Sequence, residues 1–128
     1  MERIYDMIII GGGPAGLSAG IYGGRAKLDV LVIEKESKAG QISLTSEVVN
    51  YPGILEISGS ELMVQTKKQA QGFGVNFVEE EVVGMDFSQK IKTIKTKNVE
   101  YKTLSVVIAT GAAPRKLGFP GELEYTGR

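Results

Sequence analysis

The sequence predicts an α/β fold with a parallel sheet, a strand–helix–strand (βαβ) unit and a three-stranded antiparallel meander. Two nearly continuous apolar segments, Ile4–Ile10 and 29–33, have the length and branched composition of strands covered on both faces of a parallel sheet. A run of small, helix-compatible residues separates them, and short β-prone segments with polar breaks follow later in the chain. This order of elements is typical of an α/β domain.

Composition narrows the possible chemistry. The chain has 128 residues, and its 15 Lys and Arg balance its 15 Asp and Glu, which argues against nucleic acid as a partner. At 42% hydrophobic and 23% charged residues it is typical of one globular domain. It contains no Cys and no His, which excludes disulfides, thiolate metal sites and cysteine nucleophiles and removes the commonest general base. We therefore expect any reactive group to be a cofactor.

The longest apolar runs are strand-sized, well short of the roughly 20 residues that a membrane span needs. Residues 1–6 also lack the basic and apolar regions of a signal peptide. We expect no membrane partner and a cytoplasmic location.

The first three elements form the expected βαβ unit. The strand Ile4–Ile10 stops at Gly11, and a helix is expected over 14–26, with Pro14 in the first turn, where a missing N–H is tolerated. The second strand, 29–33, completes a unit of about 30 residues, the usual size.

The central part of the chain predicts a long loop and a second helix. Residues 36–57 show no clear period and are expected to form a loop that can include a short helical turn; loops of this length are usually functional. Ser58 and Glu61 fit a capping box, which begins a helix ending at Gly72 or Gly74. The residues of this helix expected to face solvent are Lys67, Lys68 and Gln71.

The remaining segments predict strands and an irregular tail. A short strand is expected at 75–78, a meander at 81–87, 90–96 and 99–102, a separate, fully apolar strand at 104–109, and an irregular segment at 112–128. The acidic run 79–81 and the lysines of the meander are expected to be solvated, with opposite charges paired across strands.

Gly11-Gly12-Gly13-Pro14-Ala15-Gly16 fits the pattern G-x-G-x-x-G. Gly11 allows a sharp turn out of the strand, Gly13 lets a pyrophosphate approach the backbone, and Gly16 permits close contact between helix and strand. The unpaired N–H groups and the dipole at the helix N-terminus favour an anion there.

The context of this motif strengthens it. A strand precedes it, a helix follows it, and Glu34 ends the second strand near the spacing at which a carboxylate accepts a hydrogen bond from a ribose hydroxyl. These features predict a dinucleotide site. The alternative is that the glycines only make a tight turn and that Glu34 is a solvated surface acid. The unit alone leaves NAD and FAD both open, because each places an adenosine diphosphate half on it.

Several further motifs resemble the N-terminal part of bacterial thioredoxin reductases, which are flavoprotein disulfide reductases with two dinucleotide-binding domains. They occur in the same order along nearly the whole chain: IIIGGGPAGL at 8–17, IEK at 33–35, GQI at 40–42, EVVNYPG at 47–53, VIATGA at 107–112 and PRKLGFPGE at 114–122.

The resemblance implies a Rossmann-like FAD-binding domain in which the first βα unit holds FAD. Carried over by position, Gly11, Gly13, Pro14, Ala15 and Gly16 belong to the pyrophosphate turn and Glu34 to the adenosine ribose. Gly40, Gln41 and Asn50 would lie along the ribityl and flavin part, Val82 would offer backbone groups to adenine, and Ala109, Thr110 and Gly111 would pass beside the cofactor. Gln41 and Asn50 could instead bond loop backbone, and 109–111 could be a plain strand exit.

Full-length members of this family continue with an NADPH domain that carries a Cys-x-x-Cys pair. The resemblance therefore implies that residues 1–128 are only the N-terminal segment of the FAD-binding domain, an incomplete domain and a fragment inactive alone. The parent would pass electrons from NADPH through FAD to a thioredoxin-like protein disulfide. The alternatives are a fragment of a ferredoxin or flavodoxin NADP reductase and a non-catalytic NAD- or ADP-binding module. An unpaired apolar sheet edge would favour a homodimer.

Overall fold

The computed structural model describes residues 2–36, 40–113 and 115–125. Residues 37–39 of the predicted loop, and residues 114 and 126–128 of the predicted tail, lie outside the described part. The elements are β1 (Ile4–Ile10), α1 (Pro14–Arg25), β2 (Val30–Glu34), the 3-10 helix η1 (Gln41–Leu44), α2 (Gly59–Gly72), β3 (Asn76–Glu79), β4 (Val82–Asp86), β5 (Lys92–Thr96), β6 (Glu100–Ile108) and α3 (Glu122–Tyr125).

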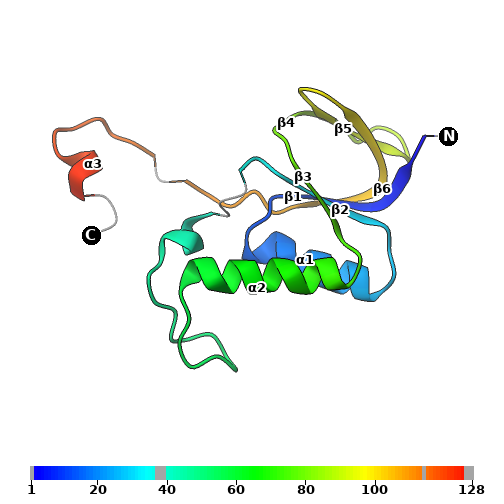
Figure 1. Cartoon of the computed structure of the whole chain (residues 1–128). Coiled ribbons are helices and arrows are strands. Elements are labelled where there is room, and N and C mark those ends of the chain that lie inside the picture. The colour runs from blue at the N-terminus through cyan, green and yellow to red at the C-terminus, as the bar shows by residue number, and fades with distance from the viewer. Residues whose placement is uncertain (1, 37–39, 114, 126–128) are drawn as a thin grey trace.

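The strands form one sheet in the order β3-β2-β1-β6-β5-β4 (Figure 1). The pairs β3–β2, β2–β1 and β1–β6 are parallel, whereas β6–β5 and β5–β4 are antiparallel. The sheet thus joins a parallel half, made by the crossover connections, to a meander. This confirms the predicted fold class.

The two faces of the parallel half pack against different partners. Ile9, Val30 and Val32 point to one face and pack with Ala70 of α2 and with Val75, so the helices α1 and α2 cover this side (Figure 1). The alternate residues of the same strands point to the opposite face, where they pack with residues of the meander. That second core consists of Tyr5, Ile8, Ile10, Leu31, Ile33 and Ile94.

The structure corrects the predicted boundary inside β6. The third strand of the meander, expected at 99–102, and the apolar strand, expected at 104–109, are one continuous strand, because β6 pairs with β1 from Lys102 to Ile108 and with β5 over its first half. The apolar segment 104–109 is only partly buried. Leu104 is 46% exposed and Ile108 is 59% exposed.

The C-terminal tail also differs from the prediction. The segment 112–128 was expected to be irregular, yet Glu122–Tyr125 forms a single helical turn, α3, at the end of an extended segment that leads away from the sheet (Figure 1). Glu122 Oε1 and Oε2 each accept a 2.7 Å hydrogen bond, from the amides of Leu117 and Gly118, which folds the chain back at this turn. Among the described residues, no helix has the length and apolar character to cross a membrane.

Candidate functional site

The turn after β1 is fixed to both neighbouring strands. The Gly11 amide donates to the Ile33 carbonyl at 2.9 Å, and the Ala109 amide donates to the Ile10 carbonyl at 2.8 Å. Gly11 has φ +114°, and a Cβ added there would lie 2.0 Å from the Ala109 oxygen. Only glycine fits this conformation and this space. The prediction that Gly11 allows a sharp turn is confirmed.

Gly16 lets α1 begin directly against that turn. A Cβ added at Gly16 would lie 1.9 Å from the Gly11 carbonyl oxygen and 3.3 Å from Ile9 Cγ2. The helix therefore starts at contact distance from β1, as predicted, and its first turn faces the carboxyl edge of the sheet.

Gly13 differs from Gly11 and Gly16 because nothing fills the space beside it. It is the N-cap of α1 with φ −79°, and no heavy atom lies within 4 Å of a Cβ added there. In the described residues, no side chain caps this helix end, and Pro14 and Ala15 are exposed in its first turn. The amides of the first helical turn are thus open to an anion.

Glu34 lies next to this turn and is buried. It ends β2 at 5% exposure, and a Cβ added at Gly12 would lie 2.3 Å from Glu34 Oε2. Lys67 Nζ of α2 lies 2.5 Å from Glu34 Oε1. Glu34 is therefore not a solvated surface acid. The expectation that Lys67 faces solvent is wrong, because its head group bonds this buried carboxylate.

The sheet brings three predicted segments to one edge. In the parallel register Ile10 pairs with Ile33 and with Ile108, so Gly11, Glu34 and Ala109 follow at the carboxyl ends of three adjacent strands. Thr110 and Gly111 continue from there and are exposed. Ligands of open α/β sheets bind outside this edge.

Three predicted site residues, Gly40, Gln41 and Asn50, lie in the long loop between β2 and α2. Gly40, with φ +58°, precedes η1, and Gln41 Nε2 donates to the Ala112 carbonyl at 3.0 Å. This bond matches the alternative that Gln41 holds loop backbone, and it brings η1 beside the segment after β6. Asn50 is exposed and lies shortly before the turn at 52–53.

Val82 begins β4 and directly follows a cluster of charged and hydroxyl side chains around the acidic run 79–81. Glu80 accepts a hydrogen bond from Thr96 Oγ1 and a 2.6 Å bond from the Tyr101 hydroxyl. Burial, together with this bond to Glu80, raises the pKa of Tyr101 to about 12. These bonds attach the β3–β4 connection to β5 and β6.

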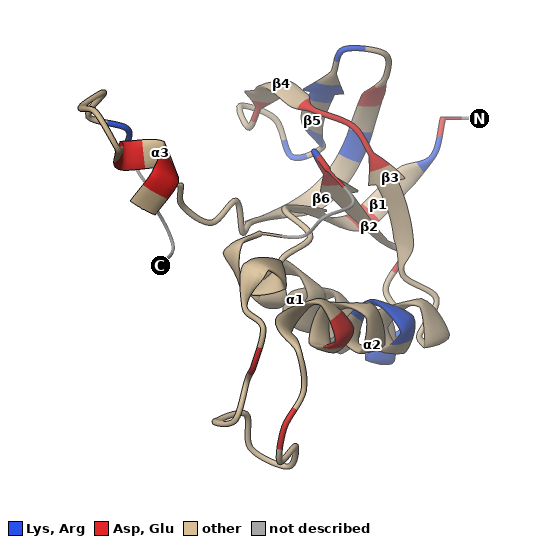
Figure 2. Cartoon of the chain, turned by 60° about the vertical axis from the view of Figure 1, so that its left-hand side comes forward, with Lys and Arg blue, Asp and Glu red and all other residues tan. Residues whose placement is uncertain are grey.

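Glu81 belongs to the same cluster and is partly open to solvent, with a side chain that is 39% exposed. It pairs with Lys97 at 3.0 Å and with Lys35 at 3.4 Å, and the two lysines hold its pKa below the usual value. Figure 2 shows these acidic residues between β3 and β4, near the basic residues of β5. The predicted pairing of opposite charges across strands is confirmed at Lys95 of β5, whose Nζ lies 3.9 Å from Oε2 of Glu100, its register partner on β6.

The family model for pyridine nucleotide-disulphide oxidoreductases matches residues 5–128. The chain belongs to this family. It is 50% identical over 129 aligned residues to the thioredoxin reductase of Peptoclostridium acidaminophilum, covering 100% of this chain and 41% of that protein. It is 42% identical to the thioredoxin reductase of Bacillus subtilis, covering 99% of this chain and 40% of that protein.

Solved structures give the same result. The thioredoxin reductase of Lactococcus lactis superposes with a TM-score of 0.86 at 41% identity, over 97% of this chain and 41% of that one. That of Streptococcus pyogenes superposes with a TM-score of 0.89 at 38% identity, over 98% of this chain and 41% of that one. The resemblance to thioredoxin reductases is confirmed. The chain spans about two fifths of the length of these relatives.

Proposed function

We propose that residues 1–128 form the FAD-binding part of a thioredoxin-reductase-like oxidoreductase. The observation that carries this proposal is the carboxyl edge of the sheet, where an open glycine turn at a helix N-terminus lies beside a buried carboxylate. The residues fit an adenine dinucleotide. Glycine at position 13 leaves open the space that a Cβ would fill in any other residue, and a pyrophosphate can enter that space.

In this proposal each part of the edge has its own task. The amides of Gly13 and Ala15 bind the pyrophosphate, Pro14 between them lies in the same turn without an N–H to donate, and Gly11 and Gly16 shape that turn. Glu34 accepts from the adenosine ribose, and Val82 offers backbone groups to adenine. The residues along the ribityl and flavin part are Gly40, Gln41, Asn50, Ala109, Thr110 and Gly111.

Bound FAD would supply two-electron redox chemistry, and the chain would position it. The chain has no cysteine, so residues 1–128 alone would not reduce a disulfide. The family match supports a parent enzyme in which NADPH reduces the flavin and a thioredoxin-like protein receives the electrons. We include in the proposal a cytoplasmic location and a homodimer.

Retention of colour tests the proposal. The purified chain is mixed with FAD, desalted, and scanned for flavin absorbance, in parallel with a sample mixed with NAD and scanned for adenine absorbance. We expect flavin to stay with the protein in a ratio near one to one and NAD to be lost. Retention of NAD without flavin would instead identify a non-catalytic nucleotide-binding module.

A further inference from the structure

The ion pair between Lys67 and Glu34 joins α2 to the candidate nucleotide site. Lys67 Nζ lies 2.5 Å from Glu34 Oε1, and the two side chains are 31% and 6% exposed. Surface ion pairs contribute little, but a carboxylate this buried needs a partner, because an unpaired buried charge is strongly unfavourable. Lys67 is the cation that supplies it.

Lys67 is itself held in place. Its Nζ lies 4.8 Å from the centre of the Phe77 ring of β3, within the range of a cation–π contact. The helix that carries it is fixed by the capping box of Ser58 and Glu61 and by Leu62 and Met63, which pack with Leu17 of α1. The ammonium group therefore meets Glu34 from a defined direction.

The two oxygens of Glu34 have different surroundings. Oε1 accepts from Lys67, whereas Oε2 lies on the side of Gly12, where an added Cβ would be only 2.3 Å away. Among the described residues, no donor is bonded to Oε2. The pairing thus leaves one oxygen next to the glycine turn with its capacity to accept a hydrogen bond intact.

We propose that Lys67 is a positioning residue for nucleotide recognition: by holding Oε1, it fixes Oε2 toward the ribose hydroxyl of a bound adenosine diphosphate group. This inference rests on the proposed function. In the absence of the ammonium group, the carboxylate turns toward solvent or toward other donors, and the site loses its preference for a ribose over a deoxyribose.

The test measures that preference directly. Calorimetric titrations give the dissociation constants of ADP and 2′-deoxy-ADP for the unaltered chain, for Lys67→Met, which keeps an unbranched side chain without the charge, and for Lys67→Arg, which keeps the charge. We expect ADP to bind the unaltered chain about tenfold more tightly than 2′-deoxy-ADP, the size of one charge-assisted hydrogen bond. The ratio should fall close to one in Lys67→Met and return in Lys67→Arg.

Lys68→Met is the matched control, because Lys68 is the next residue of α2 and is exposed; its ratio should equal that of the unaltered chain. Lys67→Gln is measured as well, so that a fold defect confined to the methionine variant does not decide the result, and its shorter, uncharged side chain should also lower the ratio.

The outcomes separate the two proposals. If both Lys67→Met and Lys67→Gln bind ADP with the unaltered ratio, the positioning role is wrong while the nucleotide site stands. A uniform loss of affinity for ADP and 2′-deoxy-ADP, with the ratio preserved, also overturns it, because that is the result of a merely structural role. If the unaltered chain binds neither ADP nor FAD, the proposed function itself fails, and this inference fails with it.

Discussion

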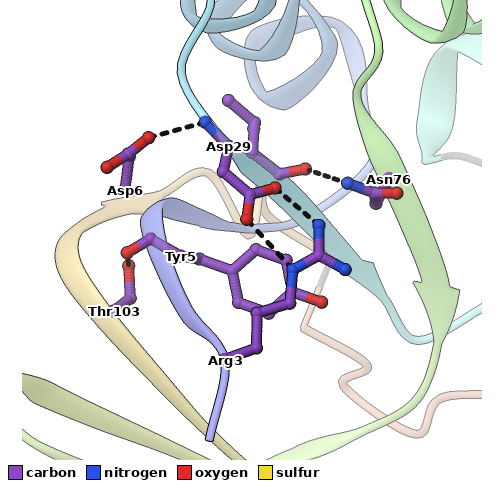
Figure 3. A network of polar contacts seen from close by, with 7 residues as sticks. Arg3, Tyr5, Asp6, Asp29, Asn76 and Thr103 are labelled. Atoms are coloured by element: carbon purple, nitrogen blue, oxygen red, sulfur yellow. Dashed lines mark hydrogen bonds and ion pairs between the residues drawn. The ribbon is translucent and has the colours of Figure 1, made fainter. Parts of the chain in front are cut away.

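The two edges of the parallel sheet differ in whether their polar groups are hydrogen-bonded within the chain. At the amino edge, Arg3 donates to both oxygens of Asp29, at 3.0 Å and 2.7 Å, and Asp6 Oδ2 accepts from the Asp29 amide at 2.7 Å (Figure 3). Asn76 Nδ2 donates to the Val30 carbonyl at 3.2 Å. At the carboxyl edge, the same strands end in a glycine turn whose helical amides face open space.

This contrast suggests that the amino edge contributes to the stability of the fold and the carboxyl edge to ligand binding. The amino edge satisfies its charges internally and ties β1, β2 and β3 together, whereas the carboxyl edge keeps donors and one carboxylate oxygen unused within the described residues. Substitutions at the amino edge should therefore change the free energy of unfolding and leave ligand affinity unchanged. Substitutions at the carboxyl edge should do the reverse, except where the turn itself is packed.

The largest expected effect is that of Gly16→Ala. Its Cβ would lie 1.9 Å from the Gly11 carbonyl oxygen, a backbone atom that can move only if the turn moves. We expect a loss of about 3 kcal/mol or more in the free energy of unfolding, in the upper range of overpacking substitutions, together with loss of FAD binding. Urea denaturation followed by circular dichroism measures the first quantity. An unfolding midpoint equal to that of the unaltered chain would show that the turn is not closely packed.

Gly13→Val separates binding from folding. The space beside Gly13 is open, and its extended backbone suits a β-branched residue, so we expect the unfolding free energy to change by less than about 1 kcal/mol. FAD affinity should fall by about 100-fold or more, because the side chain occupies the pyrophosphate position. Gly72→Val, at another glycine with open surroundings, is the matched control and should bind FAD normally. Full binding by Gly13→Val would refute the pyrophosphate path.

Tyr101→Phe tests the hydrogen bond that attaches the start of β6 to Glu80 in the β3–β4 connection. The pKa of Tyr101 in the folded chain is about 12, above its ordinary value of 10.0. Because the unfolded chain loses this proton first, Tyr101 stabilises the fold fully below pH 10 and progressively less as the pH rises from about 10 to about 12. Urea titrations across that range should show a steeper loss of stability for the unaltered chain than for Tyr101→Phe. Parallel curves would mean that Tyr101 is not bonded to Glu80 in solution.

The smallest expected effect is that of Arg3→Met. The Arg3 and Asp29 side chains are 56% and 35% exposed, so removing the pair should lower the free energy of unfolding only slightly, although the guanidinium also lies 4.4 Å from the centre of the Tyr5 ring. FAD affinity should be unchanged, which flavin fluorescence titration checks. A tenfold weaker affinity would mean that the amino edge is coupled to the site.

The sequence predicted the features that depend on neighbours along the chain. The turn at Gly11–Gly16, the capping box at Ser58 and Glu61 and the apolar strand β1 each follow from residues within one short segment. The structure confirmed them because local propensity and packing agree at these places.

The features that sequence reasoning missed depend on pairs far apart in the chain. Lys67 and Glu34 are 33 residues apart, and Tyr101 and Glu80 are 21 apart, so their charges gave no local sign that they meet. The error in β6 has a related cause. Thr103 is polar and lies between the two predicted strands, but it is fully buried. Its hydroxyl donates to the Tyr5 carbonyl (Figure 3), and the Ser105 carbonyl lies within hydrogen-bond distance of it at 2.9 Å.

Amide NMR spectra of the nitrogen-labelled chain, recorded during titration with ADP, test the central claim most directly, because they report both edges of the sheet at once. The account predicts large shifts for the amides of Gly12, Gly13 and Ala15 and for Glu34, with the amides of Asp6 and Asp29 unmoved. Shifts confined to the amino edge, or no shifts at millimolar ADP, would contradict it.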